Sequence, residues 1–328
     1  MSSSPAALLP DEPMIASENR PGSPPHGGPD QRPGQPGAVP SPVGLRRALI
    51  PLAAVYIIWG STYLGIRIAL EGFPPLALCG IRFAIAGGAI LLFLAARGAA
   101  LPDRRQWLSA LPIGALLFVG GNGFVALAEV HIGSGVAAVV VATMPLWMGL
   151  FAALAGERPR AREWVGIGLG FAAVAVLSSG GDLRADLGAT LFLLLSPVAW
   201  SSGSMLSRRA PRAPGGFMAV AASQMLIGGI LALALGLATG ERFAAMPGPR
   251  PLLAMVYLTA IGTLGFVAYS WLLRHVRPVL ATSYAFVNPL LAVVLGTALG
   301  GEALGWSTIV AAPAVALAVA LAITARGR

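Results

Sequence analysis

Long apolar runs alternate with short polar clusters from residue 48 to residue 325. Each run approaches the roughly 20 residues that an α-helix needs to cross the hydrocarbon core of a bilayer. The runs lack the strict alternation of apolar and polar residues that is typical of outer-membrane strands. The pattern therefore predicts ten transmembrane helices, at 48–70, 75–96, 107–130, 134–155, 164–180, 187–207, 216–238, 251–273, 279–299 and 304–325.

An internal repeat divides these predicted helices into two groups. Residues 131–159 return in diverged form at 275–304. In each copy a His stands fourteen residues before a Pro, within an apolar run that closes on Gly-Glu. Another set recurs 141 positions later, pairing Trp59 with Trp200, Ser61 with Ser202, and Arg67 with Arg208. The chain is therefore predicted to consist of two tandem repeats.

Each predicted repeat holds five helices, the first at 48–180 and the second at 187–325. Because five is an odd number, the second repeat enters the membrane in the opposite orientation to the first. The predicted fold class is an all-α integral membrane protein with ten transmembrane helices in two inverted five-helix repeats. Such repeats are typical of secondary transporters, whose substrate site lies near the membrane midplane between the halves.

The composition supports a membrane protein and excludes several other classes. Of the 328 residues, 56% are hydrophobic and only 11% are charged, too few to cover a soluble domain of this size. The net charge of +9 comes from arginines dispersed among the loops, so no nucleic-acid partner is expected. Cys79 is the only cysteine, which excludes an intrachain disulfide and a cysteine-based metal site.

The distribution of arginine predicts the orientation in the membrane. One set of connections holds fifteen arginines, and the opposite set holds only Arg184, Arg242 and Arg250. By the positive-inside rule both termini are expected in the cytoplasm. Residues 1–47 are predicted to form a disordered Pro/Gly-rich cytoplasmic tail, unless translation starts further downstream.

Several first-half motifs resemble those of a known family. They are WGSTYLGIRIAL at 59–70, PPLALCGIRFAIAGG at 74–88 and PLWMGLFAALAGERP at 145–159. They resemble an EamA-type member of the drug/metabolite transporter superfamily, and residues 187–325 resemble its weaker second half. The resemblance implies ten helices, cytoplasmic termini, and export of small metabolites or drugs across the bacterial inner membrane. It implies no particular substrate.

Arg82 is the most deeply placed charge in the predicted spans. It lies about seven residues, or roughly 10 Å, inside the second span. A charge at that depth is expected to face the bundle interior and to pair, with Glu129 or Glu71 as available partners. Two roles are open for Arg82: it recognises an anion or acts as a gate in a cavity, or it forms a structural ion pair. Ser223 occupies the matching position of the second half, so polar contacts need not be symmetric.

Four ionisable residues are candidates for gating or proton coupling, namely Arg67, Glu71, Glu129 and His131. Arg67 and Glu71 share a helix face and are expected to form an ordinary interfacial pair. Glu129 is either a paired or solvated acid at a helix end or a proton-coupling site. His131 is expected at the interface, with proton linkage as the alternative.

A substrate cavity is predicted where aromatic and small polar residues lie inside the spans. Pro145 and Pro289 occupy matching positions and predict paired helix kinks beside it. The aromatic rings in these spans are expected to stack on a solute. The alternative is that they form a belt at the membrane interface. The candidate cavity residues are Trp59, Ser61, Tyr63, Arg82, Met144, Trp147, Trp200, Ser204, Tyr269, Tyr284 and Asn288.

The sequence predicts a secondary transporter that exports a small organic solute, amino-acid-like or aromatic, by alternating access. It contains no phosphate-binding loop, HExxH or GxSxG motif, so ATP drive and common hydrolase chemistry are not supported. No cofactor or metal is expected, protons are a candidate coupling ion, and no oligomeric state is specified. The alternative is a polytopic membrane enzyme such as a lipid acyl or prenyl transferase. A channel is disfavoured because no filter motif occurs.

Overall fold

The computed structural model describes residues 45–154, 161–179, 186–210, 215–275 and 284–324. Helices are the regular elements throughout these ranges, and no strand occurs in them. Of the predicted tail, residues 1–44 lie outside the described part of the chain. Residues 45–47 are not part of a tail, because they begin the first helix.

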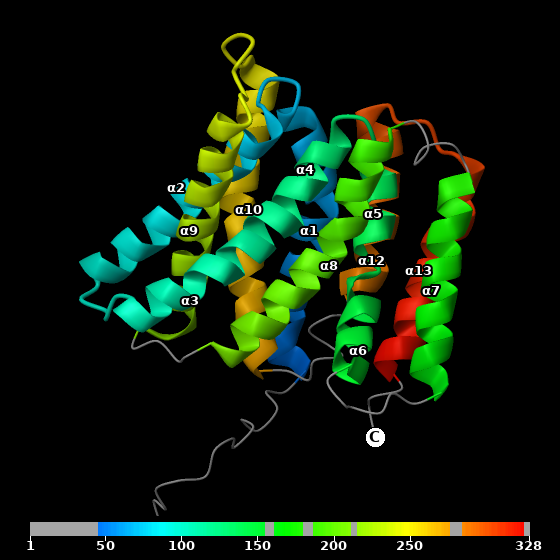
Figure 1. Cartoon of the computed structure of the whole chain (residues 1–328), viewed down its shortest axis with the longest axis horizontal. Coiled ribbons are helices and arrows are strands. Elements are labelled where there is room, and N and C mark those ends of the chain that lie inside the picture. The colour runs from blue at the N-terminus through cyan, green and yellow to red at the C-terminus, as the bar shows by residue number, and fades with distance from the viewer. Residues whose placement is uncertain (1–44, 155–160, 180–185, 211–214, 276–283, 325–328) are drawn as a thin grey trace, which may run out of the picture. The chain divides into compact units, whose positions relative to one another are not determined.

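The helices follow the predicted spans closely (Figure 1). They are α1 (Leu45–Ala69), α2 (Pro75–Ala96), α3 (Arg104–Gly114), the π-helix η1 (Ala115–Gly123), α4 (Phe124–Glu129), α5 (Ser134–Val141), α6 (Met144–Leu154), α7 (Ala161–Ser179), α8 (Leu187–Arg209), α9 (Gly216–Ala238), α10 (Pro249–His275), α12 (Tyr284–Gly300) and α13 (Trp306–Thr324). The elements α3, η1 and α4 follow one another directly and together fill the third predicted span.

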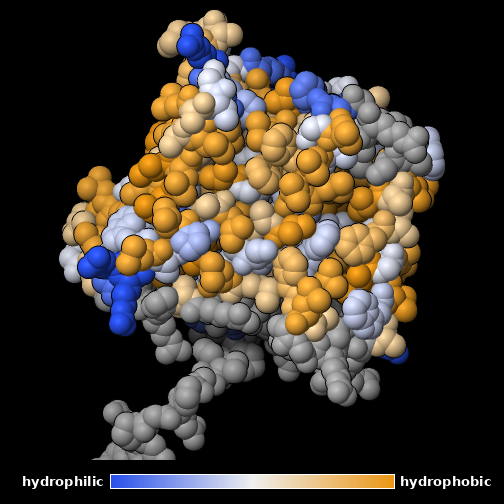
Figure 2. Space-filling view, in the orientation of Figure 1, coloured by the Kyte–Doolittle hydropathy of each residue, from blue (hydrophilic) through white to orange (hydrophobic). Residues whose placement is uncertain are grey.

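Seven helical segments are long and apolar enough to cross a membrane by length and composition. Three shorter apolar helices, Trp164–Leu177, Val287–Gly300 and Trp306–Ala318, occupy the fifth, ninth and tenth predicted spans. Apolar side chains cover most of the face shown in Figure 2, and hydrophilic ones gather toward its ends. Large apolar residues such as Leu92, 72% exposed, point outward, as expected of a surface in contact with lipid. That all ten segments cross the membrane stays a prediction.

Corresponding helices of the two halves pack against each other. Helix α2 packs along α9, α5 along α12, and α7 along α13. Helix α1 packs on α10 and α12, and its counterpart α8 packs on the matching segments η1, α4, α5 and α6. The packing partners are therefore exchanged between the halves, as in a two-fold arrangement.

The ends of the helices show that corresponding helices run antiparallel. The start of α2 is bound by Glu241, which follows the end of α9. The start of α5 is bound by Glu302, which follows the end of α12. Antiparallel pairs of this kind are expected of inverted halves. In Figure 1 the ends of α1, α4, α9 and α12 lie at the top.

Glycines allow α2 and α9 to approach closely. A Cβ added at Gly87 would lie 2.5 Å from the Leu226 nitrogen, and one at Gly229 would lie 2.4 Å from the Ala84 nitrogen. Both contacts are with backbone, so neither position accepts a side chain without moving a helix. Small residues thus allow the backbones of α2 and α9 to come into contact here.

The two predicted proline kinks differ. The fourth span is divided into α5 and α6 by a turn at Ala142-Thr143, directly before Met144 and Pro145. Pro289 lies inside α12, which continues through it as one helix. The matching prolines therefore interrupt the helix in the first half only, within the described residues.

Candidate functional site

Trp59 of α1 lies at the centre of a cluster of aromatic rings. Its ring centroid is 4.9 Å from that of Tyr269, 4.9 Å from that of Tyr284, 5.3 Å from that of Phe266 and 5.8 Å from that of Trp200. Most of these contacts are edge-on, the geometry that aromatic quadrupoles favour. All four partners belong to the second half, on α8, α10 and α12. A first-half residue is thus enclosed by second-half rings.

Glycines make room for the two tryptophans of this cluster. A Cβ at Gly265 of α10 would lie 2.7 Å from Trp59 Nε1. A Cβ at Gly121 of η1 would lie 2.7 Å from Trp200 Cε3. Ser196 of α8 donates to the Gly121 carbonyl at 2.8 Å, which ties the π-helix to α8. The π-helical stretch therefore positions the bare backbone on which Trp200 rests.

Two predicted cavity residues, Met144 and Asn288, border the aromatic cluster. The Tyr284 hydroxyl donates to Met144 Sδ at 3.7 Å, and Ser201 Oγ donates to the Met144 carbonyl at 2.9 Å. With its amide nitrogen turned toward the neighbouring carbonyls, Asn288 donates to Tyr284 at 3.2 Å and to Tyr56 at 3.3 Å. Met144 and Asn288 thus flank Tyr284, and the hydrogen bonds of this group together join α6, α8, α12 and α1.

Other predicted cavity residues lie elsewhere. Trp147 contacts Phe171, with centroids 5.1 Å apart, and so belongs to a separate aromatic group between α6 and α7. Ser61 Oγ and the Tyr257 hydroxyl are 2.5 Å apart, across the contact between α1 and α10. Tyr63 is half-buried and packs against buried apolar side chains of two groups, one that includes α2, α9 and α10 and one that includes α5, α7 and α13. Ser204 is buried on α8. The structure thus separates Trp147 from the rings around Trp59.

The site contains buried hydrogen-bond donors without acceptors. Arg82 is 2% exposed, and its Nε and Nη1 have no partner within the described ranges. Trp59 Nε1 and Trp200 Nε1 likewise have none there. The expected pair with Glu71 is wrong, because Glu71 lies 3.5 Å from Arg250 instead. The expected pair with Glu129 is also not formed, because both Glu129 carboxylate oxygens are without a hydrogen-bond partner among the residues described. A charge unpaired near mid-bilayer costs about 2.5–3.5 kcal/mol on insertion scales.

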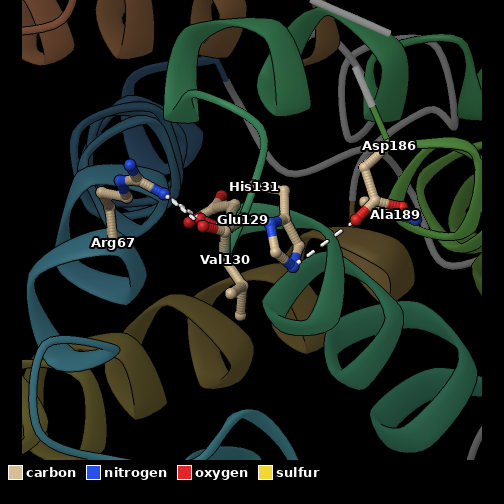
Figure 3. Close-up of polar contacts among 6 residues, drawn as sticks. All are labelled: Arg67, Glu129, Val130, His131, Asp186 and Ala189. Carbon is tan, nitrogen blue, oxygen red and sulfur yellow. Dashed lines mark hydrogen bonds and ion pairs between the residues drawn. The ribbon is translucent and has the colours of Figure 1, made fainter. Parts of the chain in front are cut away.

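Figure 3 shows the polar contacts where α4 ends. Arg67 donates to the backbone carbonyls of Glu129 and, at 3.2 Å, of Val130. The expected pair between Arg67 and Glu71 is therefore wrong. The Arg67 guanidinium instead binds carbonyl oxygens at the end of a helix, which have no backbone N–H donor within that helix. Glu129 is fully buried, and its carboxylate is not the group that Arg67 binds.

His131 and Asp186 form a contact of 3.5 Å at the same end of the bundle (Figure 3). Asp186 also accepts a hydrogen bond from the Ala189 nitrogen at 2.9 Å, as the N-cap of α8. This backbone hydrogen bond, with the nearby His131, lowers the pKa of Asp186 below its ordinary value. His131 is exposed here, as the prediction of an interfacial position requires.

Two glutamates tie the halves together, and sequence reasoning missed their role. Glu241 accepts from the Leu76 and Ala77 nitrogens, each at 2.9 Å. Glu302 accepts from the Ser134 nitrogen at 2.9 Å and from the Gly135 nitrogen at 3.2 Å. Both carboxylates therefore complement the positive end of a helix in the other half. Each follows a glycine with positive φ, and this Gly-Glu pair after an apolar run was the available signal.

Two antiparallel sets of apolar helices that meet at an aromatic centre define a multi-pass helical membrane protein. The chain belongs to the EamA-like transporter family, whose model matches it twice, at residues 46–179 and 187–324. It is thus an inner-membrane transporter within the drug/metabolite transporter superfamily. Members of this family are transporters rather than enzymes. Membership in the family implies that this protein is embedded in a lipid bilayer and binds a small-molecule substrate.

The relatives agree with this assignment. The "Uncharacterized inner membrane transporter YedA" of Escherichia coli (strain K12) is 44% identical over 281 residues, which cover 84% of this chain and 91% of the relative. The "Probable terminal-alkyne amino-acid exporter" of Streptantibioticus cattleyicolor is 26% identical over 267 residues, covering 79% and 87%. A solved crystal structure shares the fold with a TM-score of 0.62 at 22% identity, over 86% of this chain and 99% of that one.

Proposed function

We propose that the protein is a secondary transporter that moves a small organic solute by alternating access between two inverted halves. The observation that carries this proposal is the position of Trp59, a first-half residue that contacts the second half through Trp200, Phe266, Tyr269 and Tyr284. A contact between the two halves changes when one half moves against the other. The solute site of such a transporter lies between the halves and must change in the same way.

The exchanged packing partners support a two-state mechanism. When each half has the packing of the other, the two exchanged arrangements have comparable energies, and a solute can shift the balance between them. Glu241 and Glu302 close the bundle at the end where both lie, by binding helix starts of the first half. We take this as the outer end, because the arginine distribution predicts cytoplasmic termini at the other.

Export of an amino-acid-like or aromatic solute is the direction and class we favour. The aromatic rings around Trp59 offer stacking surfaces, and Asn288 is a buried amide beside them. The relative from Streptantibioticus cattleyicolor, described as a probable amino-acid exporter, supports the same class and direction.

Glu129 is our candidate for proton coupling. A charged carboxylate without a partner is costly in an apolar interior, so Glu129 is suited to carry a proton through the transport cycle. The ionisable groups that act on it from neighbouring elements are Tyr63 and Arg67 of α1, Cys79 of α2, and Glu302 after α12. Among the described residues, α5, η1 and the part of α8 near it contribute no ionisable side chain.

The proposal is tested with the purified full-length protein in liposomes. Saturable movement of labelled amino acids, nucleosides or aromatic acids, stimulated by an imposed pH gradient, is expected. Glu129→Gln should retain exchange of solute but lose its response to the gradient. Turnover of lipid without net movement of any solute would overturn the proposal and favour a membrane acyl or prenyl transferase.

The orientation is tested by labelling single cysteines in a Cys79→Ala background. Position 71 is expected to react with an impermeant reagent from outside the cell, and position 103 only after permeabilisation. Labelling of position 103 from outside would contradict the assigned orientation.

A further inference from the structure

Arg82 has the properties of a ligand-binding cation rather than of a structural one. It is 2% exposed, and its Nε and Nη1 have no hydrogen-bond partner in the described part of the chain. Its guanidinium carbon lies 4.5 Å from the centre of the ring of its neighbour Phe83, and the nearby ionisable groups Cys79 and Tyr257 are neutral in their ordinary state. A structural arginine would satisfy its donors in the folded protein, as Arg67 does with the carbonyls of Glu129 and Val130.

The guanidinium of Arg82 and the indole of Trp59 lie against one face of α10. A Cβ at Gly262 would be 3.1 Å from Arg82 Nη2, and a Cβ at Gly265 would be 2.7 Å from Trp59 Nε1. Positions three apart are neighbours on a helix surface, about 5–6 Å from one another. The side chains of Arg82 from α2 and Trp59 from α1 therefore lie beside adjacent glycines of α10, and both carry N–H groups without a hydrogen-bond partner among the described residues.

The chemistry of this pair selects a ligand. Every unused atom is a donor, and one of the two groups carries a positive charge, so the complement is an acceptor with negative charge. A guanidinium presents two parallel N–H groups, which match the two oxygens of a carboxylate. One cation balances one negative charge, which disfavours a phosphate dianion. The rings of Phe266, Tyr269 and Tyr284 surround Trp59 and suit an apolar or aromatic body.

We infer that Arg82, assisted by Trp59 Nε1, binds the carboxylate of the transported solute. The solute class is then a carboxylate with one negative charge at this end and an apolar or aromatic body. This inference rests on the proposed transport function and adds the charge that selects among its solutes.

Two pairs of probes differ only in the carboxylate. They are 3-phenylpropionate with 3-phenylpropanol, and L-phenylalanine with L-phenylalaninamide. Counterflow into liposomes that contain the full-length protein should favour the carboxylate member of a transported pair by at least tenfold. Transport of both members at equal rates, or transport of other solutes but of neither carboxylate, overturns the inference and leaves the transport function standing. Failure to move any solute means that the transport function itself is wrong.

Variants of Arg82 separate ligand binding from folding. Arg82→Gln should lower transport of the carboxylate at least tenfold and leave that of its neutral or amide counterpart unchanged, and Arg82→Lys should restore part of the loss. Arg97→Gln, an exposed arginine at the end of the same helix, is the matched control and should behave as the wild type. If Arg82→Gln unfolds the protein, Gly262→Ala replaces it, because the added methyl group pushes the guanidinium aside and should lower carboxylate transport selectively. Equal losses for both members of a pair in folded Arg82→Gln would show a structural role and overturn the inference.

Discussion

Replacing Gly87 with Ala should weaken the contact between α2 and α9, whereas the same change at the adjacent Gly88 should not. A Cβ at Gly87 would lie 2.5 Å from the Leu226 nitrogen and 2.6 Å from the Ala222 oxygen, both in the backbone of α9. A Cβ at Gly88 would meet no atom within 4 Å. The two positions are neighbours on one helix, so they form a matched pair.

The expected magnitude follows from these distances. Non-bonded heavy atoms rest about 3.5–4.0 Å apart, so a Cβ at Gly87 requires the helices to separate by about 1 Å. Overpacking of this kind typically costs about 1–3 kcal/mol. The gain in helix propensity on replacing Gly, about 1 kcal/mol, is common to both variants and cancels in their difference. Gly87→Ala is therefore expected to be less stable than Gly88→Ala by about 1–3 kcal/mol.

The assay is equilibrium unfolding in mixed micelles, followed by tryptophan fluorescence. Gly229→Ala, whose Cβ would lie 2.4 Å from the Ala84 nitrogen on the other side of the contact, should behave like Gly87→Ala. Equal stability of Gly87→Ala and Gly88→Ala would refute the reasoning, because it would mean that α2 and α9 do not touch at this point.

Three further predictions concern the site and the helix ends. Trp59→Ala should lower stability by about 3–5 kcal/mol, because a large buried ring is lost, whereas Trp59→Phe should keep most of that stability and slow solute counterflow; equal stability of the two variants would contradict the central position of the ring. Glu302→Ala should lower stability by about 0.5–2 kcal/mol as a lost cap, and Glu302→Gln by less, since its amide oxygen still accepts; unfolding midpoints unchanged in both would speak against the cap. The hydrogen bond from the Ala189 nitrogen and the nearby His131 lower the pKa of Asp186 in the folded protein. Ionised Asp186 therefore stabilises the fold fully at a pH above its unfolded pKa of about 3.9. This stabilisation is lost as the pH falls through the lower pKa of the folded state. Unfolding of wild type and Asp186→Asn should therefore differ more at pH 6 than at pH 3, and a constant difference would contradict this.

The positions of the helices and the presence of two repeats were predictable because they depend on local properties. A span requires only length and apolar composition, and in the described residues each predicted range is occupied by one helix or by successive helices. The shared pattern of His, Pro and Gly-Glu predicted that the segment of α5 and α6 in the first half corresponds to α12 in the second half. In the structure α5 packs along α12.

The composition of the site was less predictable, because it depends on which helix faces which. Phe266 is an ordinary apolar residue in the sequence, yet it contacts Trp59, Trp200, Phe83 and Phe118. The rule for neighbours four apart paired Arg67 with Glu71, but the carbonyls at the end of α4 lie within reach of Arg67 and bind it instead. The π-helix at η1 left no clear signal beyond its run of glycines around Asn122.

The described residues show that the two ends of the α2–α9 pair are not equivalent. Helix α9 ends at Gly240, with φ 81°, and the next residue, Glu241, binds the start of α2. Helix α2 ends just before Gly98, with φ 66°, but the next residue is Ala99, which has no carboxylate to offer the start of α9. Gly215, the N-cap of α9, makes no side-chain capping bond either. An inverted repeat would give two states of equal energy if its halves were identical. Under the proposed alternating access, the Glu241 cap, which has no counterpart at the described α2–α9 connection of the other end, favours the state closed at the capped end, and solute binding then supplies the free energy that opens it.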